Sequence, residues 1–282
     1  MGPSSVDDGE PIESSSLILD RIGRRATATL RSGVRDAPRL AHRANRRDDH
    51  RHRIHPTRER VMQSKLARFV PLAAAVGFVA TALFIFGVIL DLYWVRVLSK
   101  PFPVLSMMVV VAAYGRGRYA NTILAGLGLC IFGDIFLEIS DATFLAGLVA
   151  FLLGHVAYIV AFVGRSRTLR PLEFVPFAIW VGWLVSFLWP HLGPMRIPTL
   201  AYGSVIMMMM WRATAMVAGE QKPTGWDWAA MLGAITFGLS DSLIALDRFH
   251  APIDGVRIPI ILTYWVGQLL IAGSALSANA DQ

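Results

Sequence analysis

Two apolar runs, residues 119–138 and 143–163, limit what this chain can fold into more than any other feature of its sequence. Each run matches the ~20 residues that a helix needs to cross the hydrocarbon core of a bilayer. Each also contains side chains that a lipid-facing helix avoids: Asp134 and Glu138 in the first run, His155 in the second. An Asp at the centre of a membrane helix costs about 2.5–3.5 kcal/mol on insertion scales. These side chains are therefore expected to face a protein interior or a water-filled cavity.

The composition of the whole chain agrees with a membrane protein. Of its 282 residues, 54% are hydrophobic and 17% are charged, whereas a soluble domain carries about 25% charged residues. The net charge of +7 is poorly distributed for a nucleic-acid partner, because about half of the Lys and Arg residues precede Met62 and most of the others lie between the apolar runs. We therefore expect no nucleic-acid partner. Cys130 is the single cysteine, which excludes an intrachain disulfide and a metal site built from several cysteines.

Residues 1–61 differ from the rest of the chain. They are rich in Arg, Ser, Asp, Gly and His, a composition that buries too little apolar surface to offset the entropy of ordering, so we predict a disordered tail. Three interpretations stay open. The tail is a basic cytosolic segment that touches anionic lipid, or a targeting segment, against which its acidic residues argue, or an extension ahead of a translation start at Met62. Residues 62–282 are predicted to form the membrane domain.

The sequence after Met62 predicts an all-α, polytopic membrane helix bundle of about eight transmembrane helices. The predicted crossings are residues 68–90, 101–114, 119–138, 143–163, 172–190, 198–217, 227–246 and 258–277. Basic links precede the first crossing and follow the second and fourth, whereas the link after the third is acidic. Because basic loops stay on the cytoplasmic side, we expect both termini in the cytoplasm, and we expect the cytoplasmic membrane of a bacterium.

With this topology, the unusual polar side chains fall at one level of the membrane. Asp134 and Asp241 come late in helices that run outward, and Lys100 opens the second crossing from outside. The other members come early in inward-running helices or near mid-depth: Tyr202, Thr263, Tyr264, His155 and Gln268. Helical spacing also places Asp134 with Glu138, His155 with Tyr158, and Tyr264 with Gln268 on shared faces. We therefore predict a single site in the outer half of the membrane.

Several motifs occur together in a fixed order. They are Lys100–Pro101, Gly133–Asp134, GLVAFLLGHVAYIVAF at 147–162, Tyr202, GAITFGLSDSLIAL at 233–246 and TYWVGQLLIAGS at 263–274. Each piece is weak alone, but the ordered set resembles the YhhN-like family of eight-span lysoplasmalogenases over residues 68–277. One departure is Trp265, where the family pattern leads us to expect a second aromatic such as Tyr.

This resemblance implies hydrolysis of the vinyl ether bond of lysoplasmalogens, to a fatty aldehyde and a glycerophospho-ethanolamine or -choline. Such hydrolysis needs a carboxylic acid that protonates carbon, a group that orients or deprotonates water, and negative charge beside the resulting cation. Our hypothesis assigns Asp134 and Asp241 as the acid/base pair, in no fixed order, and His155 as the group that orients water or a carboxylate. The expected substrate-binding residues are Lys100, Tyr158, Tyr202, Ser240, Thr263, Tyr264 and Gln268. The expected partners are the lysophospholipid substrate and membrane lipids.

Two other classes of protein remain as alternatives. A proton-coupled small-solute transporter also uses intramembrane Asp and His, although such folds more often show inverted repeats and midplane sites. A zinc-dependent membrane amidohydrolase needs about three His or carboxylate ligands, and His155 is the only histidine within a predicted crossing. We therefore expect neither a metal nor another cofactor. For single residues the plainer interpretations are that Lys100 snorkels, that Thr263 and Gln268 join helices, and that Glu138 and Asp141 are solvated at the rim.

Overall fold

The computed structural model describes residues 58–219 and 222–276, and within them every regular element is a helix. The α-helices are α2 (Arg58–Ala67), α3 (Val70–Ile89), α4 (Tyr93–Ser99), α5 (Phe102–Tyr114), α6 (Gly117–Ile139), α7 (Phe144–Arg165), α8 (Val175–Leu188), α9 (Arg196–Gly219), α10 (Gly225–Phe249) and α11 (Arg257–Ser274). The prediction of an all-α bundle is confirmed. The predicted disordered tail lies outside the described residues as far as residue 57.

Seven segments among the described residues are long and apolar enough to cross a membrane. They correspond to the first seven predicted crossings, with one correction: the second begins at Tyr93 and not at residue 101. It consists of α4 and α5, which are separated at Lys100–Pro101 because Pro101 has no N–H to continue the helical hydrogen bonds. The eighth predicted crossing corresponds to α11, whose polar residues, Arg257 and Gln268 among them, lower its mean hydropathy.

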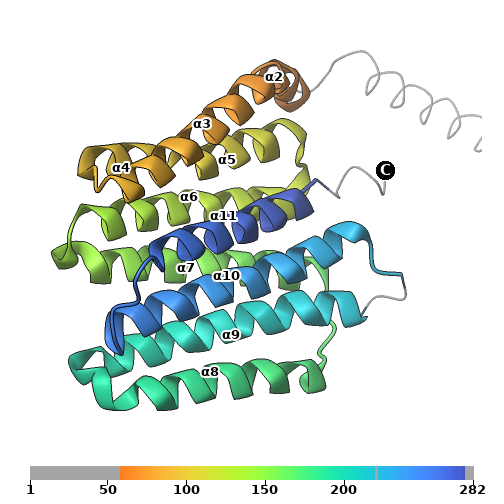
Figure 1. Cartoon of the computed structure of the whole chain (residues 1–282). Helices are drawn as coiled ribbons and strands as arrows, with labels where there is room; N and C mark the ends of the chain where they lie inside the picture. The colour runs from red at the N-terminus through yellow and green to blue at the C-terminus, as the bar shows by residue number, and fades with distance from the viewer. Residues whose placement is uncertain (1–57, 220–221, 277–282) are drawn as a thin grey trace, which may run out of the picture. The chain divides into compact units, whose positions relative to one another are not determined.

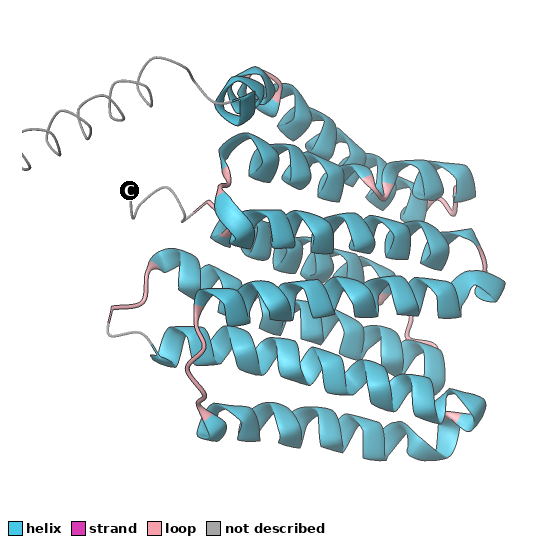
Figure 2. Ribbon diagram, turned by 180° about the vertical axis from the view of Figure 1, so that it is seen from behind, coloured by secondary structure: helices cyan, strands magenta, loops and turns pink. Residues whose placement is uncertain are grey.

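The helices run alternately in opposite directions, so that their turns gather at two ends of the bundle (Figures 1 and 2). The turns α3–α4, α6–α7, α8–α9 and α10–α11 lie together at the left in Figure 1; we call this the site end. The most extensive helix contacts join α6 with α7 and α10 with α11, and α9 packs against α7, α8 and α10. Asp134 and Asp241 lie near the ends of α6 and α10, and Tyr202 and Tyr264 near the beginnings of α9 and α11. All four are therefore toward the site end.

Small residues bring these helices close together. A Cβ atom on Gly233 of α10 would lie 2.8 Å from the carbonyl oxygen of Gly267 on α11. A Cβ atom on Gly126 of α6 would lie 2.3 Å from the ring of Tyr158 on α7, which is fully buried. These contacts fix the rotation of each helix pair and thereby the direction of the polar side chains they carry.

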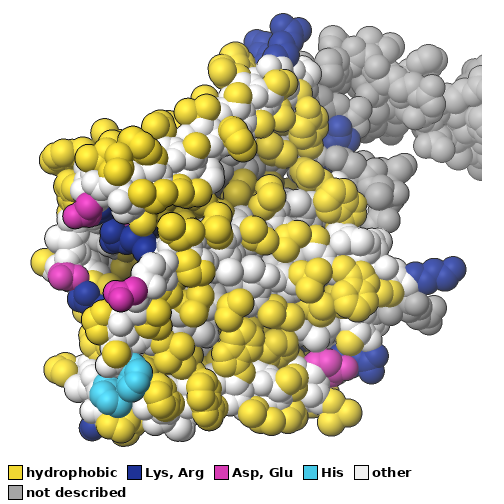
Figure 3. All heavy atoms as spheres, viewed as in Figure 1, with side chains coloured by type: hydrophobic (Ala, Val, Ile, Leu, Met, Phe, Trp, Pro, Cys, Tyr) yellow, Lys and Arg dark blue, Asp and Glu magenta, His cyan; other side chains and the backbone are white. Residues whose placement is uncertain are grey.

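The outer surface of the bundle is apolar, as lipid contact requires. Large hydrophobic side chains are exposed along the helices, including Phe78, Ile89, Leu172, Ile179 and Leu269. Figure 3 shows this apolar surface, together with acidic and basic side chains that surround a hollow at the site end. The charged side chains visible in this view lie toward the two ends of the bundle, and the surface between them is largely apolar.

Candidate active site

Asp134 is buried and is the final acceptor of a series of hydrogen bonds that joins three helices. Its side chain is 1% exposed, and its Oδ2 accepts a hydrogen bond of 2.7 Å from the hydroxyl of Tyr264 on α11. Tyr264 Oη accepts a bond of 3.3 Å from Gln268 Nε2, and Gln268 Oε1 accepts one of 2.7 Å from Tyr158 Oη on α7. Every hydrogen in this chain points toward Asp134. Such an arrangement fixes the orientation of the carboxyl group, because aligned hydrogen bonds polarise one another in a low-dielectric interior.

Asp241 belongs to a second group on α7, α9 and α10. Its Oδ2 accepts a hydrogen bond of 2.9 Å from the hydroxyl of Tyr202, and the same oxygen lies 3.9 Å from Nε2 of His155. His155 is fully buried, and neither of its ring nitrogens has a hydrogen-bond partner among the described residues. Its ring packs edge-on against Phe237 at 4.5 Å and against Tyr202 at 5.5 Å between centroids. The imidazole is thus held in place by aromatic contacts and keeps its polar atoms available.

An aromatic cluster lies between the two carboxyl groups. Phe237 contacts Tyr264, the partner of Asp134, at 5.2 Å, and it contacts His155, the neighbour of Asp241, at 4.5 Å. Phe151 packs edge-on against both Phe237 and Tyr264. The structure therefore brings the two predicted groups to opposite sides of one cluster, and no hydrogen bond between described residues joins Asp134 directly to Asp241.

Three adjoining pockets lie at the site end. The first, the charged pocket, has a volume of about 200 Å³ and is lined by six ionisable residues and several apolar ones; the ionisable residues are Lys100, Glu138, Asp141, Asp247, Arg248 and Arg257. The second, the Asp241 pocket, is about 50 Å³ and is lined by Asp241, Tyr202, Thr199 and apolar side chains. The third, the apolar pocket, is also about 50 Å³ and lies between α8, α9 and α10.

The lining residues show how the pockets are connected. The charged pocket and the Asp241 pocket share Leu137, Phe144 and Ile244 as their common wall. The Asp241 pocket and the apolar pocket share Asp241 and Tyr202, together with Thr199 and Ala245. Asp241 is thus accessible from two of the pockets, whereas Asp134 lines none of the three.

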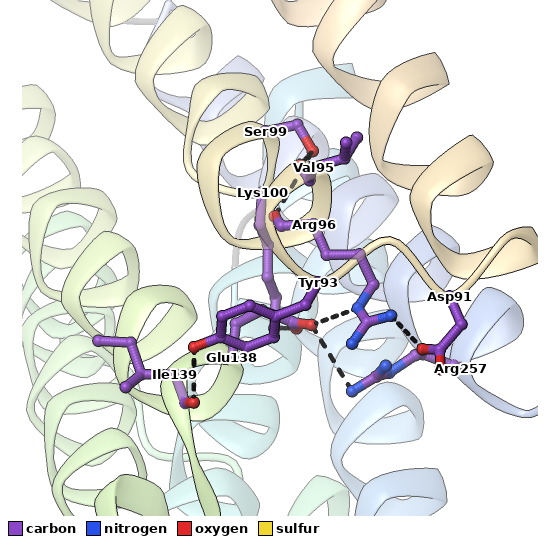
Figure 4. A network of polar contacts seen from close by, with 9 residues as sticks. All are labelled: Asp91, Tyr93, Val95, Arg96, Ser99, Lys100, Glu138, Ile139 and Arg257. Atoms are coloured by element: carbon purple, nitrogen blue, oxygen red, sulfur yellow. Dashed lines mark hydrogen bonds and ion pairs between the residues drawn. The ribbon is translucent and has the colours of Figure 1, made fainter.

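Glu138 was expected to be solvated, and this expectation is wrong. Glu138 is 7% exposed, and its two carboxylate oxygens face three cations (Figure 4). Arg96 Nε lies 3.0 Å and Arg257 Nη2 3.6 Å from Oε1, while Lys100 Nζ lies 3.1 Å from Oε2. A carboxylate can be buried at this depth because the cations and their hydrogen bonds compensate for the lost hydration.

The other predicted residues divide into two sets. Lys100 is buried beside Glu138 and lines the charged pocket, so it does not simply extend to the interface. Ser240 donates its hydrogen bond to the carbonyl of Ile260, at 2.9 Å, and Thr263 donates to Pro259 within its own helix, at 2.7 Å. The hydroxyls of Ser240 and Thr263 therefore donate to backbone carbonyl oxygens. Neither residue lines any of the three pockets. Asp141 is exposed at the rim, as expected.

Three residues that the structure places at the site were not named in the sequence analysis, namely Arg96, Thr199 and Arg257, and Glu138 was named there but not included among the expected site residues. Arg96 and Arg257 stand in segments that resemble ordinary charged links. Thr199 lines both the Asp241 pocket and the apolar pocket, and its buried hydroxyl has no hydrogen-bond partner among the described residues. A signal for Glu138 was its position one turn after Asp134 on the same helix face. Across the part of the chain that the structure describes, no group of three or more His, Cys, Asp or Glu side chains is placed to hold a metal ion.

Comparisons with known proteins identify similar chains. A family model described as the YhhN family matches residues 95–275. Lysoplasmalogenase TMEM86A of Bos taurus is 34% identical over 196 residues, which cover 66% of this chain and 80% of the relative. Lysoplasmalogenase TMEM86B of Homo sapiens is 34% identical over 188 residues, which cover 66% of this chain and 77% of the relative. A lysoplasmalogenase of Mycobacterium bovis is 32% identical over 179 residues, which cover 59% of this chain and 66% of the relative. No solved structure matches this chain significantly.

Proposed function

This chain belongs to the YhhN family, and we propose that it is a lysoplasmalogenase, an integral membrane hydrolase that cleaves the vinyl ether bond of lysoplasmalogens. The products are a fatty aldehyde and a glycerophosphoethanolamine or glycerophosphocholine. One structural observation carries the proposal: two carboxyl groups, each bound by a tyrosine hydroxyl, are buried inside a bundle of apolar helices, and one of them lines a pocket. The names of the relatives support the same activity, and nothing in the comparisons favours the transporter alternative.

The reaction begins with a proton transfer to carbon. The acid protonates the vinyl carbon distal to the ether oxygen, which leaves an oxocarbenium cation on the carbon bound to that oxygen. Water adds to this cation and loses a proton to a base, which gives a hemiacetal. The hemiacetal then breaks its bond to the glycerol oxygen, which takes up a proton, and the aldehyde is released. A site for this chemistry needs a proton donor at the pocket, negative charge beside the cation and an oriented water molecule.

We assign the direct proton transfers to Asp241, because it is the carboxyl group that lines the pockets. After it has given its proton to carbon, the Asp241 carboxylate stands beside the new cation and can accept a proton from the attacking water. Tyr202 holds one oxygen of this carboxylate at 2.9 Å. His155, whose Nε2 lies 3.9 Å from the same oxygen, is placed to orient the water. One carboxyl group can thus serve first as acid and then as base.

Asp134 is the second member of the proposed acid/base pair, but it faces Tyr264 and not a pocket. We propose that its charge acts across the aromatic cluster, where the low dielectric weakens screening and extends the reach of a carboxylate. The chain from Tyr158 through Gln268 to Tyr264 would keep that charge in place. Tyr158, Gln268 and Tyr264 are then residues that position Asp134, and in this proposal they do not touch the substrate.

The orientation of the site in the membrane is also part of this proposal. The Arg- and Lys-rich links, which contain residues 65–68, 116–118 and 165–170, lie at the end of the bundle opposite the site end. If those links face the cytoplasm, as basic loops commonly do, the charged pocket opens toward the other side. Both chain termini would then be cytoplasmic, and in a bacterium the membrane would be the cytoplasmic membrane.

An assay of aldehyde release tests the proposed function. The protein, purified in detergent, is given 1-alkenyl-glycerophosphoethanolamine, and fatty aldehyde is measured over time. The matched lipids with a saturated ether or an ester at the same position serve as controls. We expect aldehyde from the vinyl ether lipid alone, with activity that persists in the presence of a metal chelator. Absence of aldehyde from the vinyl ether lipid would contradict the proposal.

A further inference from the structure

The charged pocket contains more positive charge around Glu138 than this carboxylate can balance. Of the three cations that approach it, Arg96 also pairs with Asp91 at 2.6 Å. Lys100 and Arg257 form no ion pair with an acidic residue other than Glu138 among the described residues, although Lys100 also lies within electrostatic reach of Asp134. Two cations therefore share one carboxylate at the inner wall of a pocket. A partly buried charge without a full partner is costly, so this arrangement favours the entry of an anion.

The geometry of these two cations suits a phosphate group. Lys100 Nζ and Arg257 Nη2 approach different oxygens of Glu138, at 3.1 and 3.6 Å, and both residues line the pocket. The Arg257 side chain is 50% exposed, and its distance to Glu138 exceeds that of a hydrogen bond. Its guanidinium therefore keeps several N–H donors available, and their fork matches two phosphate oxygens.

The wall formed by α10 carries the opposite charge. Arg248 pairs with Asp141 at 2.6 Å, so those two charges cancel. Asp247 accepts a hydrogen bond of 2.8 Å from the backbone N–H of Ile253 and has no cationic partner among the described residues. The pocket thus offers an unbalanced cation pair on one wall and an unbalanced carboxylate on another. This distribution matches a ligand that carries both a phosphate and an ammonium group.

We propose that the charged pocket is the headgroup subsite of the enzyme, in which Lys100 and Arg257 bind the phosphate and Asp247 binds the ammonium group of a zwitterionic lysophospholipid. This inference rests on the proposed function and deepens it. Three glycerol carbons separate the phosphate from the ether oxygen of such a lipid. A phosphate in the charged pocket therefore places the vinyl ether in the adjoining Asp241 pocket and directs the hydrocarbon chain toward the apolar pocket. The order of the three pockets is the order of the three parts of the substrate.

A binding measurement tests the subsite separately from catalysis. The probe is 1-O-alkyl-glycerophosphoethanolamine, whose saturated ether is not hydrolysed, and the reference is 1-O-alkylglycerol, which has the same chain and no headgroup. We expect Arg257→Gln to weaken binding of the phospholipid about tenfold, the size of one charge-assisted hydrogen bond, without changing binding of the reference. Arg257→Lys should restore most of the loss. Arg196→Gln is the matched control, because it removes an exposed cation at the same end of the bundle but outside the pocket. It should change the binding affinity of neither ligand.

The ammonium contact needs its own measurement. Asp247→Asn should weaken binding of the ethanolamine lipid several-fold and should not weaken binding of 1-O-alkyl-glycerophosphate, which lacks the amine. The subsite assignment would be overturned if Arg257→Gln weakened binding of the phospholipid and of the reference equally, or weakened binding of neither. Competition by inorganic phosphate as strong as that by soluble glycerophosphoethanolamine would reduce the pocket to a general anion site and overturn the zwitterion assignment. If the protein releases no aldehyde, the proposed function fails, while this binding comparison still decides the subsite.

Discussion

Nε2 of His155 lies 3.9 Å from Oδ2 of Asp241, close to a hydrogen bond but beyond its range. Both side chains are held by neighbours: Asp241 by the hydroxyl of Tyr202, and the imidazole by the rings of Phe237 and Tyr202. The imidazole nitrogens have no other partner among the described residues. A buried polar group without a partner is uncommon in a folded protein. Here the group faces the carboxyl group that lines the pockets, which makes it a candidate for contact with a reacting water.

His155→Gln tests this contact. We expect kcat for aldehyde release to fall about 10²-fold, the lower end of the range for general acid–base groups, while KM changes little because the headgroup and chain contacts remain. His250→Gln removes a histidine at the surface of the site end and should leave kcat unchanged. A lower kcat with a raised KM and a lower melting temperature would instead indicate a packing role for His155.

Four substitutions test the roles of the two carboxyl groups and of their tyrosine partners. The two Asp→Asn variants should both lower kcat, whereas the two Tyr→Phe variants should differ in their effect on KM. Asp241→Asn should lower kcat by at least about 10²–10⁴-fold, because it removes the group to which we assign the proton transfers. Asp134→Asn should also lower kcat strongly. Tyr202→Phe should alter both kcat and KM, since Tyr202 lines the pocket, whereas Tyr264→Phe should alter kcat alone. Steady-state kinetics on the same lipid check these four variants, and full activity in either Asn variant would refute the pair.

Protonation at carbon leaves an isotopic record in the product. When the reaction is run in D₂O and the aldehyde is reduced at once to the alcohol, we expect one deuterium on the carbon next to the former aldehyde carbon. We also expect kcat to be lower in D₂O than in H₂O, because the proton moves in the first step. Mass spectrometry of the alcohol gives the readout. An aldehyde without deuterium would mean that the ether bond breaks by another route.

The contact between α6 and α7 predicts a clear difference between two glycines. Gly126→Ala places a methyl group 2.3 Å from the buried ring of Tyr158, so we expect a loss of about 1–3 kcal/mol in stability. Gly128→Ala meets only Met108, at 3.6 Å, which is an ordinary contact, and should change stability by less than about 0.5 kcal/mol. Melting temperatures of both variants in the same detergent test this. Equal melting temperatures would show that Tyr158 can move aside.

Neutralising Glu138 should destabilise the protein far more than neutralising Asp141. Glu138→Gln leaves the buried Lys100 and the half-exposed Arg257 without their ion-pair partner, and losses of about 3–5 kcal/mol are typical when one member of a buried ion pair is removed. The Asp141 side chain is 85% exposed, so Asp141→Asn should change the free energy of unfolding by no more than about 0.5 kcal/mol. The measurement is thermal unfolding in detergent with and without salt. Equal stability of the two variants would mean that the cations at Glu138 are already solvated.

The sequence alone determined the class of fold and the level of the site along the helices. The length of each apolar run sets whether it can cross a bilayer, and the position of a polar residue within a run sets its distance from the end. That is why Asp134, Asp241, Tyr202 and Tyr264 were expected at one level, and they lie toward the same end of the bundle. Spacing along one helix also predicted that Tyr264 and Gln268 share a face, and they form a hydrogen bond.

Only the tertiary structure decided which of these groups meet. The rotation of one helix against another depends on how glycines and large rings interlock between them, as at Gly126 and Tyr158, and no periodicity within a single helix contains that information. The same packing inserts Phe237 between the two carboxyl groups and turns Glu138 from the expected rim position into a buried ion-pair centre. A charged side chain can be buried only where partners from other helices converge on it, so its burial is a property of the assembled bundle.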